Sequence, residues 1–132
     1  MDLYKELPSL EFTIDLKDLR GSRTNLKYPG EFKCKIPDNT DLAEMDKRRA
    51  LMSLGLDENL EATTRLFYEK LSYLQCIVLE GPDWWKQSNK GASLLDANII
   101  AEMYDQAVEA EEKWKKAVWG DAPEAQPEEE SE

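Results

Sequence analysis

The sequence predicts an α+β fold, in which an N-terminal β-hairpin is followed by three helices and a disordered acidic C-terminal tail. Two short stretches near the N-terminus alternate apolar and polar residues, which is typical of strands with one buried face. Three later stretches carry apolar residues at helical spacing, with turn-forming residues between them. The chain has 132 residues, 41% of them hydrophobic, so we expect one domain over residues 1–120.

The two strands of the hairpin are expected near residues 12–16 and 32–36. Their alternating apolar residues are Phe12, Ile14 and Leu16 in the first strand and Phe32, Cys34 and Ile36 in the second. The connection between them, residues 19–30, is longer than a typical hairpin loop and rich in turn formers. We therefore expect this connection to be a mobile or functional loop.

The first helix is expected over residues 41–53, after a Pro-Asp-Asn-Thr stretch that ends the second strand. Asp41 and Glu44 have the spacing of a capping box, in which two side chains bind the free backbone N–H groups at a helix start. Gly55 fits the C-terminal stop of this helix.

The second helix is expected over residues 57–79, with its end at the Gly81-Pro82 pair, because proline cannot continue a helix. It carries two apolar stripes, which are formed by Leu60, Phe67, Leu71, Leu74 and Val78 and by Leu66, Tyr73 and Ile77. Two stripes indicate burial on two sides, so we expect this helix to be the central one.

The third helix is expected from Asp96 to Val118, with Gly120 as its stop. Its apolar face consists of Ile99, Ile100, Met103, Tyr104, Ala107, Val108, Trp114 and Val118. The lysines are concentrated toward its C-terminal end, which matches the helix dipole.

The net charge of −11 is unevenly distributed. The acidic segment, residues 121–132, has six acidic residues, no basic residue and no large apolar residue, so we expect disorder there. The basic hairpin, residues 17–35, instead carries six basic residues and two acidic ones. It is either a solvated loop or a contact surface for an acidic protein, with Arg20, Arg23 and Lys27 as candidate contacts.

The composition argues against most catalytic sites. The chain has no histidine, which excludes Ser-His-Asp and Cys-His catalysis and histidine metal sites, and two cysteines alone cannot complete a zinc site. No phosphate-binding loop or calcium loop is present. We therefore expect no enzyme activity, cofactor or metal, and an acidic chain without a long apolar stretch predicts binding to neither nucleic acid nor membrane.

The string Gly81-Pro82-Asp83-Trp84-Trp85 is the most distinctive in the sequence. Adjacent tryptophans after a helix end predict that one ring closes the edge of the core while the other is half exposed. The alternative is a binding patch, in which Trp84, Trp85 and Tyr104 are partly exposed and contact a protein partner.

The order of these features resembles that of a known family. It comprises a hairpin, a helix, a long helix ending in Gly-Pro-Asp-Trp-Trp, a helix start at Leu95-Asp96, and then Ile99, Tyr104, Val108, Glu111 and Trp114. Over residues 10–118 this pattern resembles the small tail assembly chaperones of long-tailed, siphovirus-type bacteriophages.

The resemblance implies a non-catalytic assembly factor. Such a chaperone binds the tape measure protein, keeps it soluble and helps to recruit tail tube subunits. The resemblance also implies a homo-oligomer in the host cytoplasm that is absent from the mature virion.

An acidic inhibitor or DNA mimic, which would occupy the basic cleft of a nucleic-acid enzyme, is the second interpretation. A mimic needs its acidic residues on the folded surface at phosphate-like spacing. Here six of the net eleven negative charges lie in the acidic segment, and the remaining −5 is ordinary for a small domain. This distribution favours the chaperone.

Overall fold

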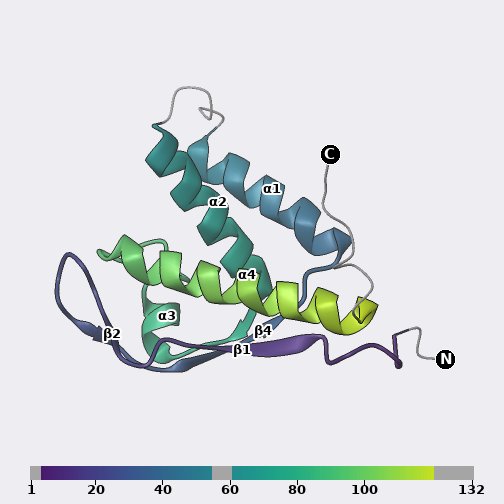
Figure 1. Cartoon of the computed structure of the whole chain (residues 1–132). Coiled ribbons are helices and arrows are strands. Elements are labelled where there is room, and N and C mark those ends of the chain that lie inside the picture. The colour runs from purple at the N-terminus through teal and green to yellow at the C-terminus, as the bar shows by residue number, and fades with distance from the viewer. Residues whose placement is uncertain (1–3, 55–60, 121–132) are drawn as a thin grey trace, which may run out of the picture.

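Two long antiparallel strands form the base of the computed structural model, which describes residues 4–54 and 61–120. β1 (Glu11–Asp15) pairs with β4 (Glu31–Lys35), and Ile14 lies opposite Phe32. The apolar residues of both strands face the helices, as their alternation predicts. Antiparallel strands followed by helices confirm the predicted α+β fold (Figure 1).

The connection between β1 and β4 contains a second, smaller sheet. β2 (Leu19–Arg20) pairs antiparallel with β3 (Lys27–Tyr28), and the N–H of Gly21 donates to the carbonyl of Leu26. The predicted long connection is present, and the ribbon within it was not predicted, because strands of two residues are too short to show alternation.

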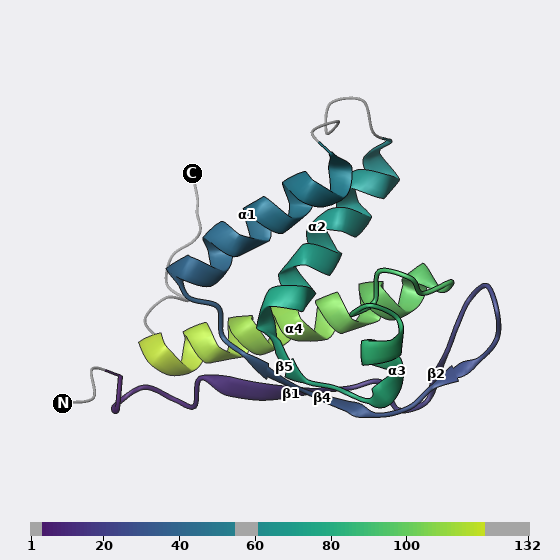
Figure 2. The same cartoon turned by 180° about the vertical axis from the view of Figure 1, so that it is seen from behind.

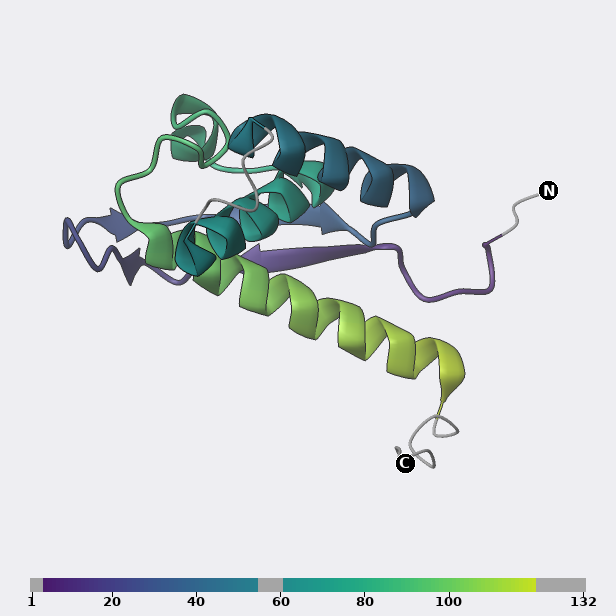
Figure 3. The ribbon, with the colours of Figure 1, turned by 90° about the horizontal axis from the view of Figure 1, so that it is seen from above.

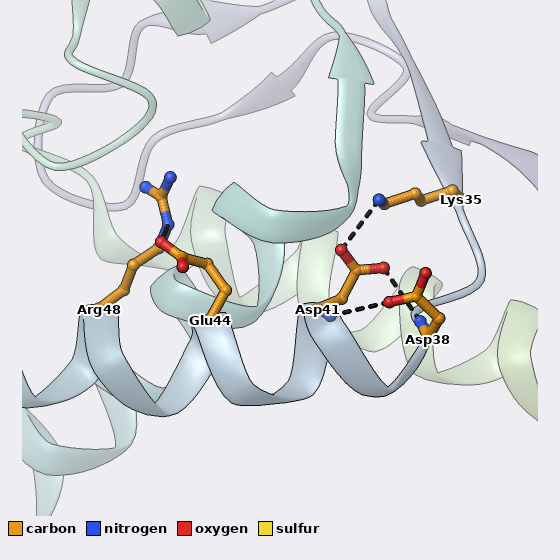
Figure 4. A network of polar contacts seen from close by, with 5 residues as sticks. All are labelled: Lys35, Asp38, Asp41, Glu44 and Arg48. Atoms are coloured by element: carbon orange, nitrogen blue, oxygen red, sulfur yellow. Dashed lines mark hydrogen bonds and ion pairs between the residues drawn. The ribbon is translucent and has the colours of Figure 1, made fainter.

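The first helix, α1 (Asn39–Ser53), begins two residues earlier than predicted. Its capping box is formed by Asp38 and Asp41, not by Asp41 and Glu44, with reciprocal N–H···O bonds of 2.8 and 2.9 Å (Figure 4). The Nζ of Lys35 also lies 2.9 Å from Asp41 Oδ1, so the end of β4 is tied to the start of α1. The predicted stop, Gly55, lies outside the described residues.

The second helix, α2 (Ala62–Ile77), ends before the predicted position, and its predicted start at Asp57 and the predicted stripe residue Leu60 lie outside the described residues. The chain continues as β5 (Val78–Glu80), which pairs with β4 and gives a three-stranded sheet of order β1-β4-β5 (Figure 2). Val78 has the spacing of the helical apolar stripe in the sequence. The prediction relied on that spacing alone and therefore placed the end of the helix too late.

The last two helices are α3 (Asp83–Gln87), a short helix that contains both adjacent tryptophans, and α4 (Ala97–Trp119). The bounds of α4 agree with the predicted ones to within one residue, and Gly120 follows it as the C-cap. Neither a helix nor a strand was predicted from the sequence for residues 83–87. The expected disordered tail lies outside the described residues.

The three long helices lie on one side of the sheet, with α2 between α1 and α4 (Figures 1 and 3). The core between these layers contains Ile14, Phe32, Cys34, Leu71, Leu74, Ile77, Trp85, Ile99, Ile100, Met103 and Ala107. The prediction that α2 is the central, buried helix is confirmed for its C-terminal half, where Leu71, Leu74 and Ile77 are buried. Its second stripe was expected to be buried throughout, but Leu66 near its N-terminus is 53% exposed. None of the helices described is both long and apolar enough for a membrane span.

Candidate functional site

The buried carboxylate of Asp96 holds the basic hairpin against the start of α4. Its Oδ1 accepts the backbone N–H groups of Arg23 at 2.7 Å and Thr24 at 2.9 Å. Its Oδ2 accepts the hydroxyl groups of Thr24 at 2.5 Å and Tyr28 at 2.6 Å. One carboxylate therefore fixes both the backbone and the side chains of the β2–β3 ribbon.

Asn98 and Gly21 complete this attachment. Asn98 accepts the N–H of Ser22 at 2.8 Å and donates to the carbonyl of Arg20 at 3.0 Å. A Cβ atom on Gly21 would lie 2.1 Å from the carboxyl group of Asp96, so only glycine allows the ribbon to approach this closely. The basic hairpin is thus docked on α4 rather than free in solvent.

The hydrogen bonds to Asp96 determine its charge state. Burial acts to raise the pKa of the carboxyl group, but the hydroxyls of Thr24 and Tyr28 and two backbone N–H groups together lower it to about 2. Burial and the neighbouring carboxylate raise the pKa of Tyr28. At neutral pH an ionised Asp96 therefore faces a neutral tyrosine.

The role of Asp96 was not apparent in the sequence, where it stood only as the expected first residue of a helix. It is the N-cap of α4, but its side chain makes no capping hydrogen bond. Asp96 lies some 70 positions after the turn-rich basic segment that it binds. No local sequence pattern connects residues that are so far apart.

Five of the six basic residues of the hairpin fall into two groups. Lys33 and Lys35 are paired with Glu11 and Asp41, at 3.6 and 2.9 Å. The three predicted contact residues, Arg20, Arg23 and Lys27, are all exposed. Within residues 4–54 and 61–120, no carboxylate forms an ion pair with any of them. The guanidinium group of Arg20 donates to the carbonyl of Asn25 at 2.8 Å, so its charge is held by the hairpin itself without being neutralised.

The two adjacent tryptophans have different surroundings. Trp85 is buried, with its ring centre 5.5 Å from that of Phe32. Trp84 is partly exposed, packs edge-on against Tyr28 at 5.1 Å and donates from Nε1 to the carbonyl of Pro29. The predicted arrangement in which one ring closes the core is the one found, and the alternative of an exposed patch containing both rings is wrong.

Tyr104 lies on α4, apart from the two tryptophans, and packs against α2. Its ring packs against Tyr73, with centres 5.3 Å apart, and the Nζ of Lys70 lies 5.6 Å from its centre. Tyr73 in turn donates a hydrogen bond to Glu111. Tyr104 is only partly exposed and belongs to a separate aromatic cluster.

A shallow apolar groove of about 270 Å³ lies between the N-terminal halves of α2 and α4. This α2–α4 groove is lined chiefly by Leu66, Phe67 and Lys70 from α2 and by Ala97, Ile100 and Ala101 from α4. Asn98 also lines it, so the groove borders the attachment point of the basic hairpin. Sequence reasoning missed the groove because it placed Leu66 in a buried stripe.

Comparison with family models, curated proteins and solved structures found no match to this chain. Within the part of the chain that the structure describes, no group of three or more Cys, Asp or Glu side chains is arranged to hold a metal ion.

Proposed function

We propose that this protein is a non-catalytic tail assembly chaperone of a long-tailed bacteriophage. In this role it binds the tape measure protein in the host cytoplasm, keeps it soluble, helps to recruit tail tube subunits and is absent from the mature virion. The resemblance over residues 10–118 supplies the protein class. The observation that carries the proposal is the apolar α2–α4 groove, which is linked through Asn98 to a hairpin that exposes Arg20, Arg23 and Lys27.

A chaperone that holds an aggregation-prone client must expose apolar surface and still stay in solution. Several leucines are more than half exposed in this protein, namely Leu26, Leu51, Leu54, Leu66 and Leu95. The net charge of −11 favours solubility and so offsets the tendency of such a surface to aggregate.

Co-expression with the tape measure protein of the same phage tests the proposal. We expect the tape measure gene directly downstream of this one, and a soluble complex when both proteins are made together. The tape measure protein expressed alone should aggregate. A tape measure protein that stays equally insoluble with and without this partner would contradict the proposed function.

A shortened variant that ends at Gly120 serves as an internal control. Because the acidic segment contains no large apolar residue, its removal should leave the melting temperature unchanged. It removes six negative charges, so the solubility of the complex should decrease.

A further inference from the structure

We propose that the α2–α4 groove and the basic hairpin together form one docking site for an amphipathic helix whose apolar face is flanked by acidic residues. The identity of the client rests on the proposed function. The chemistry of the site rests only on the geometry of this chain.

The shape of the groove fits a helix. Leu66 and Phe67 form one wall, and Ala97 and Ala101, one turn apart on α4, form a low opposite wall with the buried side chain of Ile100 between them. A furrow between two packed helices accepts the side-chain ridge of a third helix, which enters with apolar residues at positions i, i+3, i+4 and i+7.

The one charged residue that lines the groove is basic. Lys70 lines it directly, and Asn98 connects it to the backbone of Arg20 and Ser22 in the basic hairpin. Both oxygens of the nearby Asp96 are occupied by hydrogen bonds from the hairpin, so neither is free to pair with a guanidinium group. A helix seated in the groove would therefore meet Lys70 and the exposed side chains of the basic hairpin, and acidic flanks would complement their positive charge.

A strand is a poorer occupant than a helix. At the free edge of β1, the side-chain amide of Gln106 already binds both the N–H and the carbonyl of Asp15, at 3.1 and 2.9 Å. The other edge strand, β5, has three residues. Short or blocked edges resist the addition of a further strand. A flat anionic membrane is also disfavoured, because the apolar residues lie in a furrow.

Two synthetic helical peptides with the same leucine-rich face test the proposal, one flanked by glutamates and the other by lysines. Fluorescence anisotropy with the full-length protein should show tighter binding of the glutamate-flanked peptide. Its Kd should rise with salt, because exposed charges are screened over about 8 Å at physiological ionic strength. Equal affinity for both peptides would overturn the proposal.

Charge reversal provides the sharper comparison. The double variant Arg23→Glu/Lys27→Glu should weaken binding of the glutamate-flanked peptide by about tenfold and strengthen binding of the lysine-flanked one. The matched control, Lys115→Glu/Lys116→Glu, makes the same change in net charge at the far end of α4 and should leave both affinities unchanged. Equal effects of the two double variants would show that only net charge matters and would refute the site.

The apolar part of the site has its own pair of variants. Leu66→Glu should abolish binding of the glutamate-flanked peptide, whereas Leu51→Glu on α1, at a comparably exposed leucine, should not. Circular dichroism checks the fold of each variant, and Leu66→Ser replaces Leu66→Glu if the latter melts early. Binding that survives both Leu66 changes in folded protein would remove the groove from the site.

Two further outcomes separate this proposal from the proposed function. If the tape measure protein is held equally well by wild type, Leu66→Glu and Arg23→Glu/Lys27→Glu, the docking site is wrong and the chaperone function stands. If the peptides behave as expected but the tape measure protein is not held, the site stands and the function is wrong. Stronger binding to phosphatidylserine-containing vesicles than to either peptide would instead assign the surface to a membrane.

Discussion

Trp85 closes the core between the sheet and the helices, and only 3% of the residue is exposed. Its ring packs edge-on against Phe32, and Gly91 approaches so closely that a Cβ there would lie 2.8 Å from the Trp85 ring. We predict that Trp85→Ala lowers the free energy of unfolding by about 3–5 kcal/mol, because it leaves a large cavity. Urea denaturation followed by circular dichroism measures this change.

The control is Trp119, which is 67% exposed at the end of α4. Trp119→Ala should change the free energy of unfolding by no more than about 0.5 kcal/mol, as is usual for surface substitutions. Equal effects of the two substitutions would mean that Trp85 does not support the core.

Asp96 makes stability depend on pH in the acid range. Its pKa is lowered from 3.8 to about 2 in the folded protein, so its contribution to stability is present above about pH 4 and is lost as the pH falls toward 2. We predict that Asp96→Asn reduces stability at neutral pH and flattens the loss between pH 4 and 2. Thermal melts of both proteins at several pH values measure the effect, and parallel pH profiles would contradict it.

At the scale of an element, the start of α1 shows which residues cap a helix. Asp38 and Asp41 form the capping box. Glu44 Oε2 instead lies 3.3 Å from Nε of Arg48, one turn further along the helix (Figure 4). We predict that Asp38→Ala costs about 1 kcal/mol of stability, since a backbone N–H loses its partner. Glu44→Ala should cost roughly 0.5 kcal/mol or less, the value of a surface pair.

Chemical denaturation of the two variants, measured side by side, tests this order. The capping box expected from spacing alone would require Glu44→Ala to be the more damaging change. That result would restore the box at Asp41 and Glu44 and move the start of the helix.

At the scale of the whole molecule, basic and acidic residues are concentrated in different segments of the chain. The basic hairpin docks at the start of α4, and the acidic segment follows the C-terminal end of this helix in the sequence. Segments of opposite charge on the same chain favour head-to-tail contact between copies, which generates a ring where the rotation closes. We therefore propose a homo-oligomer held partly by these charges.

Sedimentation velocity tests this proposal. We predict larger species at low salt, a shift toward monomer at high salt, and loss of association in the variant that ends at Gly120. Arg23→Glu/Lys27→Glu should have the same effect as the truncation. A monomer at low salt and high protein concentration would exclude head-to-tail association.

The sequence by itself determined the α+β class, both long strands and the bounds of α4. These follow from local periodicity, because alternation and helical stripes each report the burial of neighbouring residues. It also showed that residues 17–35, with Arg20, Arg23 and Lys27, are basic within an acidic chain, since charge can be counted without a fold.

Only the tertiary structure decided the features whose partners lie far away along the chain. Val78 leaves the helical pattern because β4, more than forty residues earlier, offers it backbone hydrogen bonds. Asp96 becomes the anchor of the hairpin through groups 68 to 73 residues away. Leu66 lines a groove because α4 covers only part of the apolar surface of α2. A local pattern shows that a residue can be buried or bonded, but the spatial neighbours decide whether it is.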